Sequence, residues 1–365
     1  MRVVFVQKFV PHYRLPFFER LRSELAARDI GFELIYGPPD PYEKSKVRME
    51  FPEWGRQVNS RIVKIAGRYL YWQGAIKHVR RNDLVVVEHA AKLIDNYLLY
   101  AASRLGYIHY SYFGHGENFQ TKHELGVSRA VKKAMLRKVS RWFAYTEISR
   151  QSLLRQEVDD TLITVVNNTL KTPDLGEVSF EKTANQFLYI GGLYADKRLD
   201  LMLDAATRVA AQVEDFKLHV VGEGPLQHEI ESAAVNSPWL RYHGALYGVE
   251  RDKMLASSQA ILMPGLVGLV AIDSFHFRCP VITSDVGQHS PEIAYLERDV
   301  NALIDSKAGN AETYAQLMLR FVQEPGLAER LQSACADSAG RYTIENMVEN
   351  FIAGVTEVYA EARNH

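Results

Sequence analysis

Glycines that directly follow β-branched runs in the second half of the chain are the residues best suited to chemistry. Gly191 and Gly192 follow the run Gln186–Ile190, and Lys197 stands a few residues further on, before a helical pattern. Glycine lets backbone amides approach a phosphate closely, and a lysine ammonium adds positive charge. This pattern predicts a phosphate-binding loop.

A second loop of the same kind is VVGEGPLQHEI, which contains Gly222, Glu223 and Gly224. Pro225 follows at a position where the start of a helix favours proline. Tight turns that require glycine would explain either loop alone. Two such loops, followed by a third, favour one phosphate-binding edge of a sheet.

The third loop lies in MPGLVGLVAIDSFHFRCPVITSD, which reads as a strand end, a loop, a helix and a strand. The loop residues are Gly265, Leu266, Val267, Gly268 and Leu269. Amides at the start of a helix that begins near Leu269 would suit a nucleotide pyrophosphate. Asp273 lies one turn further in, where its carboxylate could accept hydrogen bonds from a ribose 2′,3′-diol. An acidic residue is also favoured in any first helical turn, and the two interpretations weigh equally.

In the first half, the run YFGHGENF places His115 between two glycines at the end of a predicted strand. A histidine on such a turn can hydrogen-bond a sugar or a reaction centre. Glu117 beside it could orient the ring or serve as a base. The alternative is a surface loop that happens to contain a histidine.

The sequence lacks the motifs of several common classes of binding site. The segment after the first strand has no glycine, so the G-x-G-x-x-G dinucleotide fingerprint is missing there, and no P-loop occurs. No two aspartates stand two residues apart, so a metal-bound Asp-x-Asp site is absent. Cys279 and Cys335 show no metal-ligand spacing and are expected to be buried small hydrophobes.

The elements that must position these residues alternate along almost the whole chain. Short β-branched runs between helical patterns predict parallel sheets covered by helices. The runs of the first half are Arg2–Val6, Phe32–Tyr36, Leu84–Glu88, Tyr107–Phe113, Trp142–Thr146 and Leu162–Val166. Those of the second half are Gln186–Ile190, Lys217–Val221, Leu240–Gly244, Ala260–Pro264, Pro280–Ser284 and Asn301–Asp305. The expected fold class is α/β, with two doubly wound Rossmann-like domains that face a central cleft and bind ligands beyond the carboxyl ends of their strands.

A stretch bearing Pro, Gly and Thr separates the two series of runs and reads as a linker. At 365 residues the chain is also long for a single core. We expect an N-terminal domain over residues 1–172 and a second domain over 173–344. A last helix over 345–365 is expected to pack back on the first domain.

Charge is divided unevenly between the halves. Residues 1–172 hold 28 Lys and Arg against 17 Asp and Glu, which is +11, whereas the rest hold 15 against 27. This asymmetry predicts an anionic partner for the first half, the alternative being ordinary solvated faces that happen to segregate.

The run KHELGVSRAVKKAMLRKVSRWF predicts a basic amphipathic helix in that half. Its cations are Lys122, Arg129, Lys132, Lys133, Arg137, Lys138 and Arg141. No signal peptide or membrane span is recognised. We therefore expect a cytoplasmic protein that binds peripherally to the anionic inner face of the cytoplasmic membrane.

The order and spacing of four segments resemble the C-terminal domain of glycosyltransferase family 4. The segments are GGLYADKRLDLMLDA, VVGEGPLQHEIESAA, HGAL and the long segment around Asp273. The resemblance spans roughly Gly191–Asp305 and continues weakly through the first half, at VPHYRLPFFERL and at the acceptor-side loop GHGENF. It implies the GT-B fold and retaining, metal-independent transfer from a nucleotide sugar.

The resemblance also assigns residues, with two departures. In the family's Glu-x7-Glu motif the second Glu binds the ribose and the first faces the donor sugar, but here Asp273 and Gly265 stand at these positions. The family's basic pair corresponds to Gly192 and Lys197, with Arg198 adjacent. The donor-binding residues so implied are Gly191, Gly192, Lys197, Arg198, Gly222, Glu223, Leu246, Gly265–Leu269 and Asp273. The implied catalytic residues are His115, Glu117, Lys197 and Asp273.

The activity that follows from the resemblance is glycosyl transfer in bacterial surface-polysaccharide or lipopolysaccharide synthesis. A UDP- or GDP-linked sugar would be the substrate, a glycan or a lipid-linked sugar the acceptor, and no cofactor, metal or nucleic acid is expected. Two alternatives stay open. One is a non-catalytic nucleotide-sugar-binding partner, suggested by the missing carboxylate at Gly265, and the other is a GT-B nucleotide-sugar epimerase.

Overall fold

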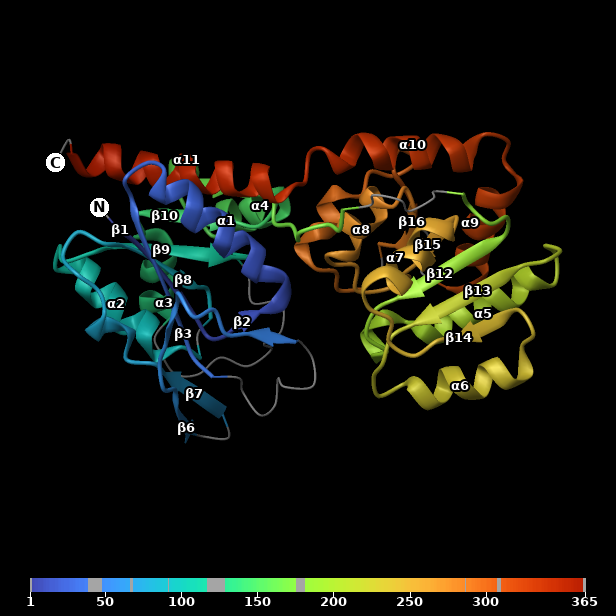
Figure 1. Ribbon diagram of the computed structural model, residues 1–365, viewed down its shortest axis with the longest axis horizontal. Helices are drawn as coiled ribbons and strands as arrows, with labels where there is room; N and C mark the ends of the chain where they lie inside the picture. Colours follow the sequence, from blue (N-terminus) through green and yellow to red (C-terminus); the bar gives the residue numbers. More distant parts are fainter. Residues whose placement is uncertain are drawn as a thin grey trace. The chain divides into compact units, whose positions relative to one another are not determined.

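The computed structural model describes residues 2–38, 48–65, 68–90, 92–116, 129–174, 181–285, 287–306 and 310–363. The chain divides into two compact units, shown in Figure 1. Unit 1 comprises Met1–Lys171 and Ile344–His365, and unit 2 comprises Thr172–Thr343. Within the described residues, no helix has the length and apolar character needed to cross a membrane.

Unit 1 is built on a seven-stranded sheet in the order β11-β10-β9-β8-β1-β3-β5, with every neighbouring pair parallel. Its strands are β1 (Arg2–Gln7), β3 (Gly31–Tyr36), β5 (Arg56–Gln57), β8 (Leu84–Glu88), β9 (His109–Gly114), β10 (Arg141–Ala144) and β11 (Ile163–Val165). Its α-helices are α1 (Leu15–Ala26), α2 (Ile94–Arg104), α3 (Arg129–Arg137), α4 (Glu147–Arg155) and α11 (Ile344–Arg363). Two small antiparallel pairs join β2 (Val10–Pro11) to β4 (Met49–Glu50) and β6 (Arg61–Ile65) to β7 (Arg68–Trp72).

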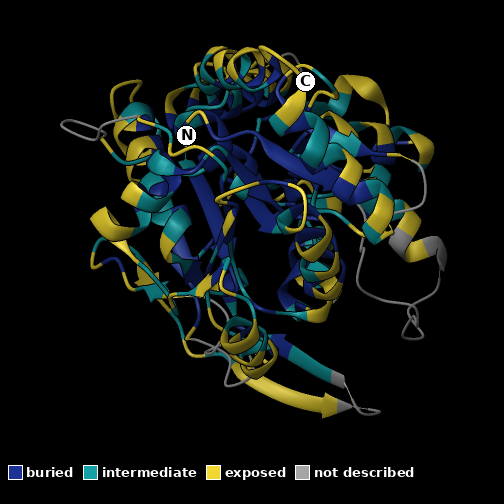
Figure 2. Ribbon diagram, turned by 90° about the vertical axis from the view of Figure 1, so that its right-hand side faces the viewer, coloured by how far each residue is buried: buried dark blue, intermediate teal, exposed yellow. Residues whose placement is uncertain are grey.

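Side chains along the strands of unit 1 alternate between the two faces of the sheet, and each face has its own hydrophobic core. Phe5 and Val6 are adjacent on β1 and lie in different cores, because successive side chains of a strand point to opposite faces. The core around Val6 includes Leu99 of α2. The core around Phe5 includes α11, whose Phe351 stacks on Phe143 of β10 with 4.1 Å between the ring centroids. Helix α11 therefore completes the hydrophobic core of unit 1. Figure 2 shows buried residues along the strands and exposed ones on the outer sides of the helices.

Unit 2 is built on a six-stranded parallel sheet in the order β14-β13-β12-β15-β16-β17. Its strands are β12 (Gln186–Ile190), β13 (Lys217–Val221), β14 (Leu240–Tyr242), β15 (Ala260–Leu262), β16 (Val281–Ser284) and β17 (Ala302–Asp305). Its α-helices are α5 (Leu199–Ala210), α6 (Gln227–Asn236), α7 (Gly248–Ser257), α8 (Val270–His276), α9 (Ala311–Gln323) and α10 (Leu327–Ala339). Helix α5 packs against α9, and α8 packs against α10.

The strand order of unit 2 contains a topological switch point. Strand β12 lies beside β15, although β13 and β14 separate the two in the sequence. Loops that leave neighbouring strands in opposite directions open a crevice at the carboxyl ends, where open α/β sheets bind their ligands. The loops that follow β12 and β15 are therefore the place to look for a site.

The predicted strands are confirmed with small shifts. Strand β9 begins at His109 rather than at Tyr107, and β14 ends at Tyr242 rather than at Gly244. The expectation missed β5, the β2–β4 pair and the β6–β7 hairpin. Strands β2, β4 and β5 have two residues each, and Ile62 and Val63 of β6 are exposed, so none of these segments shows a buried hydrophobic run.

The basic run of unit 1 forms helix α3, but Arg141 is not part of its exposed face. Arg141 begins β10, is 2% exposed, and pairs with Glu357 at 2.7 Å and with Glu361 at 3.0 Å. The tertiary fold thus uses this arginine to attach α11 to the sheet. Lys122 lies outside the described residues.

Candidate active site

The first two glycine loops of unit 2 meet backbone to backbone. A Cβ on Gly222 would lie 1.8 Å from the carbonyl oxygen of Gly191, and Gly222 has a φ of +145°. The Leu193 amide donates to the carbonyl of Glu223 at 2.9 Å. A Cβ on Gly224 would lie 2.5 Å from the Leu193 carbonyl oxygen. No side chain fits between these loops, so the contact between the two backbones requires their glycines, and the contact of these loops with a phosphate stays a prediction.

Lys197 connects the loop after β12 to the loop after β15. Its Nζ donates to the carbonyl oxygen of Leu266 at 2.5 Å. The two residues are 69 positions apart in sequence, but they meet at the switch point because β12 and β15 are neighbours. Burial lowers the pKa of Lys197 to about 8, against a smaller opposing effect of Asp196. A partly desolvated ammonium at this point is suited to a phosphate group.

Tyr194 occupies the space that a side chain at position 192 would need. A Cβ on Gly192 would lie 2.3 Å from Cε2 of the Tyr194 ring. The hydroxyl of Tyr189 also donates to the carbonyl of Gly192 at 2.7 Å. A basic residue at Gly192, as the family has it, would require the tyrosine ring to move.

Gly265 has no room for the carboxylate that the family places there. A Cβ at this position would lie 2.4 Å from the carbonyl oxygen of Asp196 and 2.9 Å from Cγ of Arg198. Arg198 has a left-handed φ of +56° and ends the short 3-10 helix Ala195–Lys197. The turn that carries Lys197 therefore packs directly on Gly265 and leaves no space there for a glutamate side chain.

We expect Gly265→Glu, the substitution that restores the family's carboxylate, to be unfavourable. Overpacking of this kind typically costs about 1–3 kcal/mol, and the shifted turn should weaken nucleotide binding. Thermal unfolding and titration calorimetry check both effects. Gly340→Glu is the matched control, because a Cβ at Gly340 meets nothing within 4 Å. A Gly265→Glu variant that is stable and binds nucleotide as well as the unmodified protein would contradict this packing argument.

The third glycine loop is held by contacts to the segment after β16. The amide of Val267 donates to Nδ1 of His289 at 3.1 Å, and the amide of Ser290 donates to the Val267 carbonyl at 2.9 Å. Leu266 has a left-handed φ of +42°. Of the amides expected to face a ligand, that of Val267 is therefore already bonded within the protein.

Asp273 lies in α8 and is paired rather than open to solvent. It is 6% exposed, and its Oδ2 accepts from Nη2 of Arg251 in α7. Arg251 also pairs with Asp252 at 3.0 Å. Burial raises the pKa of Asp273, and the Arg251 guanidinium opposes this shift. Oδ1 of Asp273 is shielded from water and accepts no hydrogen bond from any described residue. It is therefore the carboxylate oxygen that remains for a ribose hydroxyl. The interaction with ribose stays a prediction.

The other predicted donor residues line the same edge. Glu223 is exposed, and its backbone carbonyl holds the loop around Leu193. Leu246 is half-buried between β14 and α7. Nε of Arg198 lies 3.8 Å from Oδ1 of Asp200. These placements bring the predicted residues of unit 2 to the carboxyl ends of its strands.

His115 follows β9 in unit 1, is half-buried and lies beside the half-buried ring of Tyr145. Its ring lies 4.5 Å from the Tyr145 ring, between centroids. Burial lowers the pKa of His115 to about 4, and the charge of Arg14 acts in the same direction. Arg14 is 5% exposed and donates to Oδ1 of Asn168 at 2.6 Å. His115 is therefore a neutral imidazole at physiological pH, and Glu117 lies outside the described residues.

Sequence reasoning did not single out His89, Arg14, Arg251 or His289. His89 follows β8 as His115 follows β9, and burial lowers its pKa to about 4. Ligands of α/β sheets bind beyond the carboxyl ends of the strands, and this rule, applied to β8, would have identified His89. No nearby sequence pattern marks Arg251 or His289 as functional, because their hydrogen-bond partners lie on other elements.

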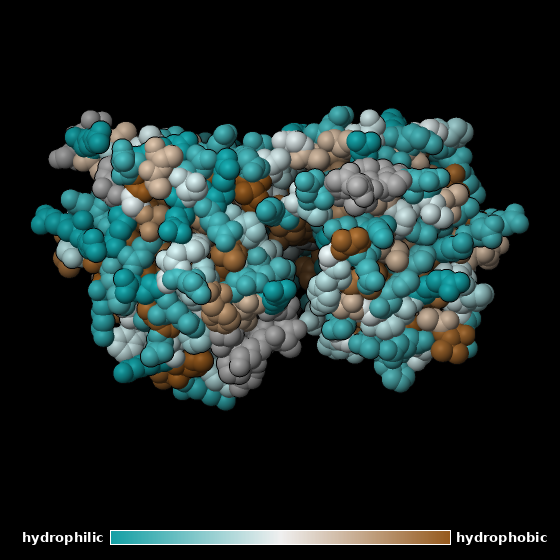
Figure 3. Space-filling model, in the orientation of Figure 1, coloured by the Kyte–Doolittle hydropathy of each residue, from teal (hydrophilic) through white to brown (hydrophobic). Residues whose placement is uncertain are grey.

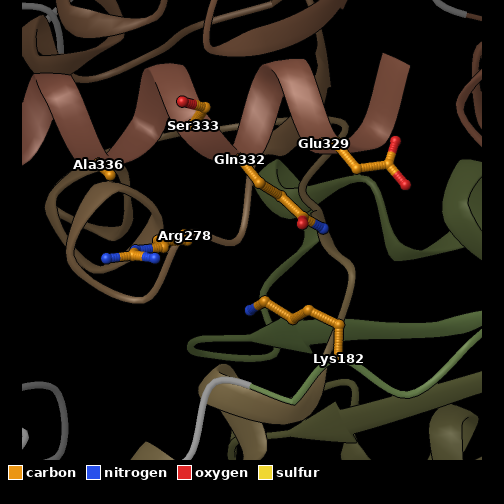
Figure 4. A pocket seen from close by; sticks show the side chains of 6 residues that line it. All are labelled: Lys182, Arg278, Glu329, Gln332, Ser333 and Ala336. Atoms are coloured by element: carbon orange, nitrogen blue, oxygen red, sulfur yellow. The ribbon is translucent and has the colours of Figure 1, made fainter. Parts of the chain in front are cut away.

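The hollow drawn in Figure 4 is at the opposite edge of unit 2. Lys182, Arg278 and residues of α10 line this space of about 390 Å³. Lys182 precedes β12 and Arg278 precedes β16, so the hollow lies at the amino ends of the strands. Nζ of Lys182 donates to the carbonyls of Phe277 at 2.8 Å and Leu255 at 3.3 Å. Its ammonium therefore supports the backbone on the side away from the glycine loops.

Among the described residues, no group of three or more His, Cys, Asp and Glu side chains is arranged to hold a metal ion. Both cysteines are buried and form no disulfide.

Two parallel α/β units with a switch-point site define the GT-B class, and comparison with known structures confirms this fold. The outer-core lipopolysaccharide galactosyltransferase WaaB is similar with a TM-score of 0.70 and 13% identity, over 98% of this chain and 99% of WaaB. Anabaena HepE, solved with UDP, matches with a TM-score of 0.69 and 13% identity, over 98% of this chain and all of HepE. The pneumococcal O-GlcNAc transferase GtfA, solved with UDP and GlcNAc, matches with a TM-score of 0.67 and 10% identity, over 98% of this chain and 99% of GtfA.

A sequence model of the family described as glycosyl transferases group 1 matches residues 184–324, which lie within unit 2. No curated protein matches the chain. The family match and the fold together support a glycosyltransferase.

Proposed function

We propose that this protein transfers a sugar, with retention of anomeric configuration, from a nucleotide sugar to a glycan or lipid-linked acceptor of the bacterial envelope. The observation that carries the proposal is the bond from Lys197 to Leu266, which places a half-buried ammonium at the switch point beside three glycine loops. UDP in the structures of HepE and GtfA supports a uridine-linked donor. The activity of WaaB supports an envelope glycan as the acceptor class.

In the proposed reaction the donor diphosphate lies at the glycine loops, and Asp273 receives the ribose. The acceptor oxygen forms a bond to the anomeric carbon as the bond from that carbon to the diphosphate oxygen breaks. The proton of the acceptor hydroxyl passes to the departing diphosphate. Lys197 stabilises the negative charge that grows on this leaving group. His115, as a neutral ring, would hydrogen-bond the donor sugar or the reaction centre.

Incubation with a panel of nucleotide sugars, with and without a lipid-linked acceptor, tests the proposal by mass spectrometry of the products. A glycosylated acceptor is the expected result. Donor binding without any product would favour the non-catalytic partner, and conversion of the donor alone would favour an epimerase.

His115→Ala is expected to lower turnover about 100-fold or more, the usual range for a general acid, base or hydrogen-bonding group at a reaction centre. Nucleotide affinity should change little, because the nucleotide-binding loops belong to unit 2. Initial rates and calorimetry separate the two quantities.

The matched control for that variant is His109→Ala, because His109 starts the strand that His115 follows and burial also lowers its pKa. This control should keep full turnover. Lost nucleotide affinity with normal turnover in the His115 variant would contradict the assigned role.

We further propose that unit 1 binds an anionic membrane surface near the amino ends of β8 and β9. Leu105 is 86% exposed, and the neighbouring Arg104 lines a groove of about 510 Å³ together with Lys138. An exposed leucine beside two cations is suited to an anionic lipid surface. The face of the molecule drawn in Figure 3 is mostly hydrophilic, with scattered apolar side chains. On α3, Lys133 and Arg137 both pair with Glu157, so their charge is partly neutralised.

Co-sedimentation with anionic vesicles, but not with neutral ones, is expected at low salt. Each cation near such a surface contributes about 1 kcal/mol, so the double variant Arg104→Gln, Lys138→Gln should bind roughly 30-fold more weakly. The control variant Arg20→Gln, Arg28→Gln removes the same charge from α1 and from the turn that follows it, and should still sediment. Equal binding to both kinds of vesicle, or to neither, would leave a soluble acceptor as the better account.

A further inference from the structure

The hairpin formed by β6 and β7 exposes apolar side chains on both of its faces. Ile62 is 44% exposed and Val63 is 45% exposed, and because they are adjacent in β6 they point to opposite faces. All side chains of residues 61–64 are exposed, as the lower part of Figure 2 shows. No described strand pairs with the outer edge of β6. The hairpin therefore presents apolar surface that a partner could cover.

This hairpin lies in a stretch of sequence whose charged residues are all basic. Residues 54–82 contain seven Lys and Arg and no Asp or Glu. Arg61 and Lys64 flank the exposed apolar pair, and neither forms an ion pair with a described residue. Instead, Cζ of Arg61 lies 5.5 Å from the ring centroid of Trp72, and Nζ of Lys64 lies 5.4 Å from that of Tyr69. A partner of this surface is therefore expected to be anionic.

An anionic lipid surface fits the hairpin better than an anionic glycan. A glycan would stack on open aromatic faces, but one face of each of the two rings is already covered by a cation of the hairpin. A hydrophilic glycan would also leave Ile62 and Val63 in water. The interfacial region of a bilayer, in contrast, accepts apolar side chains, aromatic rings and cations together.

A second copy of the chain is a poorer partner because of the charges on β6. A symmetric antiparallel pairing of two β6 strands, centred on Ile62 and Val63, would place Arg61 opposite Lys64 of the other copy. Like charges directly opposite each other destabilise a pair of strands. Cations on an edge strand thus oppose its pairing with itself.

The hairpin and the exposed Leu105 lie at the two ends of α2. Tyr71 of β7 forms a β-bridge with Leu93, which directly precedes α2, and Leu105 directly follows the helix. Leu98 is 42% exposed and lies on the same side of the helix as Leu105, because seven residues make about two turns. The one acidic residue of α2 is buried. A bilayer surface along α2 would therefore pass both of its ends, where the hairpin and Leu105 lie.

We propose that the β6–β7 hairpin is a membrane-binding element of unit 1. Ile62 and Val63 enter the head-group region of an anionic bilayer. Arg61 and Lys64 bind the lipid phosphates around them. The assignment rests on the membrane binding proposed above and adds a second contact to that of Leu105. It divides the interaction into an apolar part and an electrostatic part, which substitution can separate.

Co-sedimentation with vesicles that contain phosphatidylglycerol, and with vesicles of phosphatidylcholine alone, tests the assignment on two double variants. Arg61→Gln, Lys64→Gln should bind the anionic vesicles about 30-fold more weakly at low salt. This deficit should shrink at 1 M salt, where the Debye length is about 3 Å. Ile62→Thr, Val63→Thr keeps branched side chains that favour a strand and should bind about 10-fold more weakly at both salt concentrations.

The matched control is Val235→Thr, Val300→Thr, which removes exposed apolar groups from unit 2 and should bind normally. Thermal unfolding of all three variants should match that of the unmodified protein, because the substituted side chains are exposed. A polarity-sensitive dye on Ile62→Cys gives a second measurement, since both native cysteines are buried. Its emission should shift to the blue on anionic vesicles, whereas a dye on Val235→Cys should not respond.

Normal vesicle binding by both hairpin variants, together with lost binding by Arg104→Gln, Lys138→Gln, would overturn the assignment and leave the membrane binding of unit 1 in place. A dimer that Ile62→Thr, Val63→Thr dissociates would identify a second copy as the partner and would also overturn it. If the unmodified protein sediments with neither kind of vesicle, the proposed membrane binding fails and the assignment with it. Binding to dextran sulfate in that case would identify an anionic glycan as the partner.

Discussion

Lys197→Met is expected to lower the turnover number about 100- to 1,000-fold, the loss typical when one preorganised group that stabilises developing charge is removed. The ammonium of Lys197 is half-buried between the loops that follow β12 and β15 and donates to the Leu266 carbonyl. In the proposed reaction, negative charge grows on the departing diphosphate. Methionine fills a similar volume without stabilising that charge. Initial rates at saturating donor and acceptor measure the effect.

The same ammonium predicts a pH dependence of the unmodified enzyme. Burial lowers the pKa of Lys197 to about 8, so the free enzyme loses this charge as the pH rises through about 8. We therefore expect kcat/KM to fall above that pH, since this parameter reports the ionisation of the free enzyme. The decline should be missing from the pH profile of Lys197→Met.

Lys182→Met is the matched control for this prediction. Lys182 is also a half-buried lysine of unit 2 that donates to backbone carbonyls, but it lies at the amino ends of the strands. Its replacement should lower thermal stability, as at Lys197, and leave turnover unchanged. Equal loss of turnover in both variants would indicate general damage to unit 2 and would contradict the assigned role of Lys197.

Asp273→Ala is expected to have two separate effects. If Oδ1 receives the ribose, nucleotide affinity should fall about 10- to 150-fold, the equivalent of about 1.5–3 kcal/mol for a charge-assisted hydrogen bond. The free energy of unfolding should also fall, by about 3 kcal/mol, because Arg251 loses one of its two buried carboxylate partners. Calorimetry with nucleoside diphosphate and denaturant unfolding measure the two effects.

Asp252→Ala separates these effects, because Asp252 is also buried and is the other partner of Arg251. This variant should lose stability and keep its affinity for nucleotide. A folded Asp273→Ala variant with unchanged affinity would end the assignment of Asp273 to the ribose.

The strands and the glycine loops of this protein were predictable from sequence because their causes are local. A buried parallel strand requires a short run of β-branched and other apolar residues, and both β12 and β13 end at the predicted residues. A glycine is required wherever another backbone approaches, as at Gly222. Both requirements appear as short patterns of residue types, so a reading of short segments located the loops at which Lys197 and Asp273 lie. The backbone that approaches Gly222, that of Gly191 in another loop, could not be named from such a pattern.

The partners of the charged residues were not predictable in this way. Lys197 meets Leu266 because β12 and β15 are neighbours in the sheet, and Asp273 meets Arg251 because α7 and α8 come together in the fold. The same tertiary packing buried Arg141, which the sequence had placed on an exposed basic face. A buried charge or donor is stabilised only by a group brought within a few ångströms of it, and distance along the chain does not specify that group. The order of the strands therefore decided which polar atoms are paired and which, such as Oδ1 of Asp273, have no hydrogen-bond partner among the described residues.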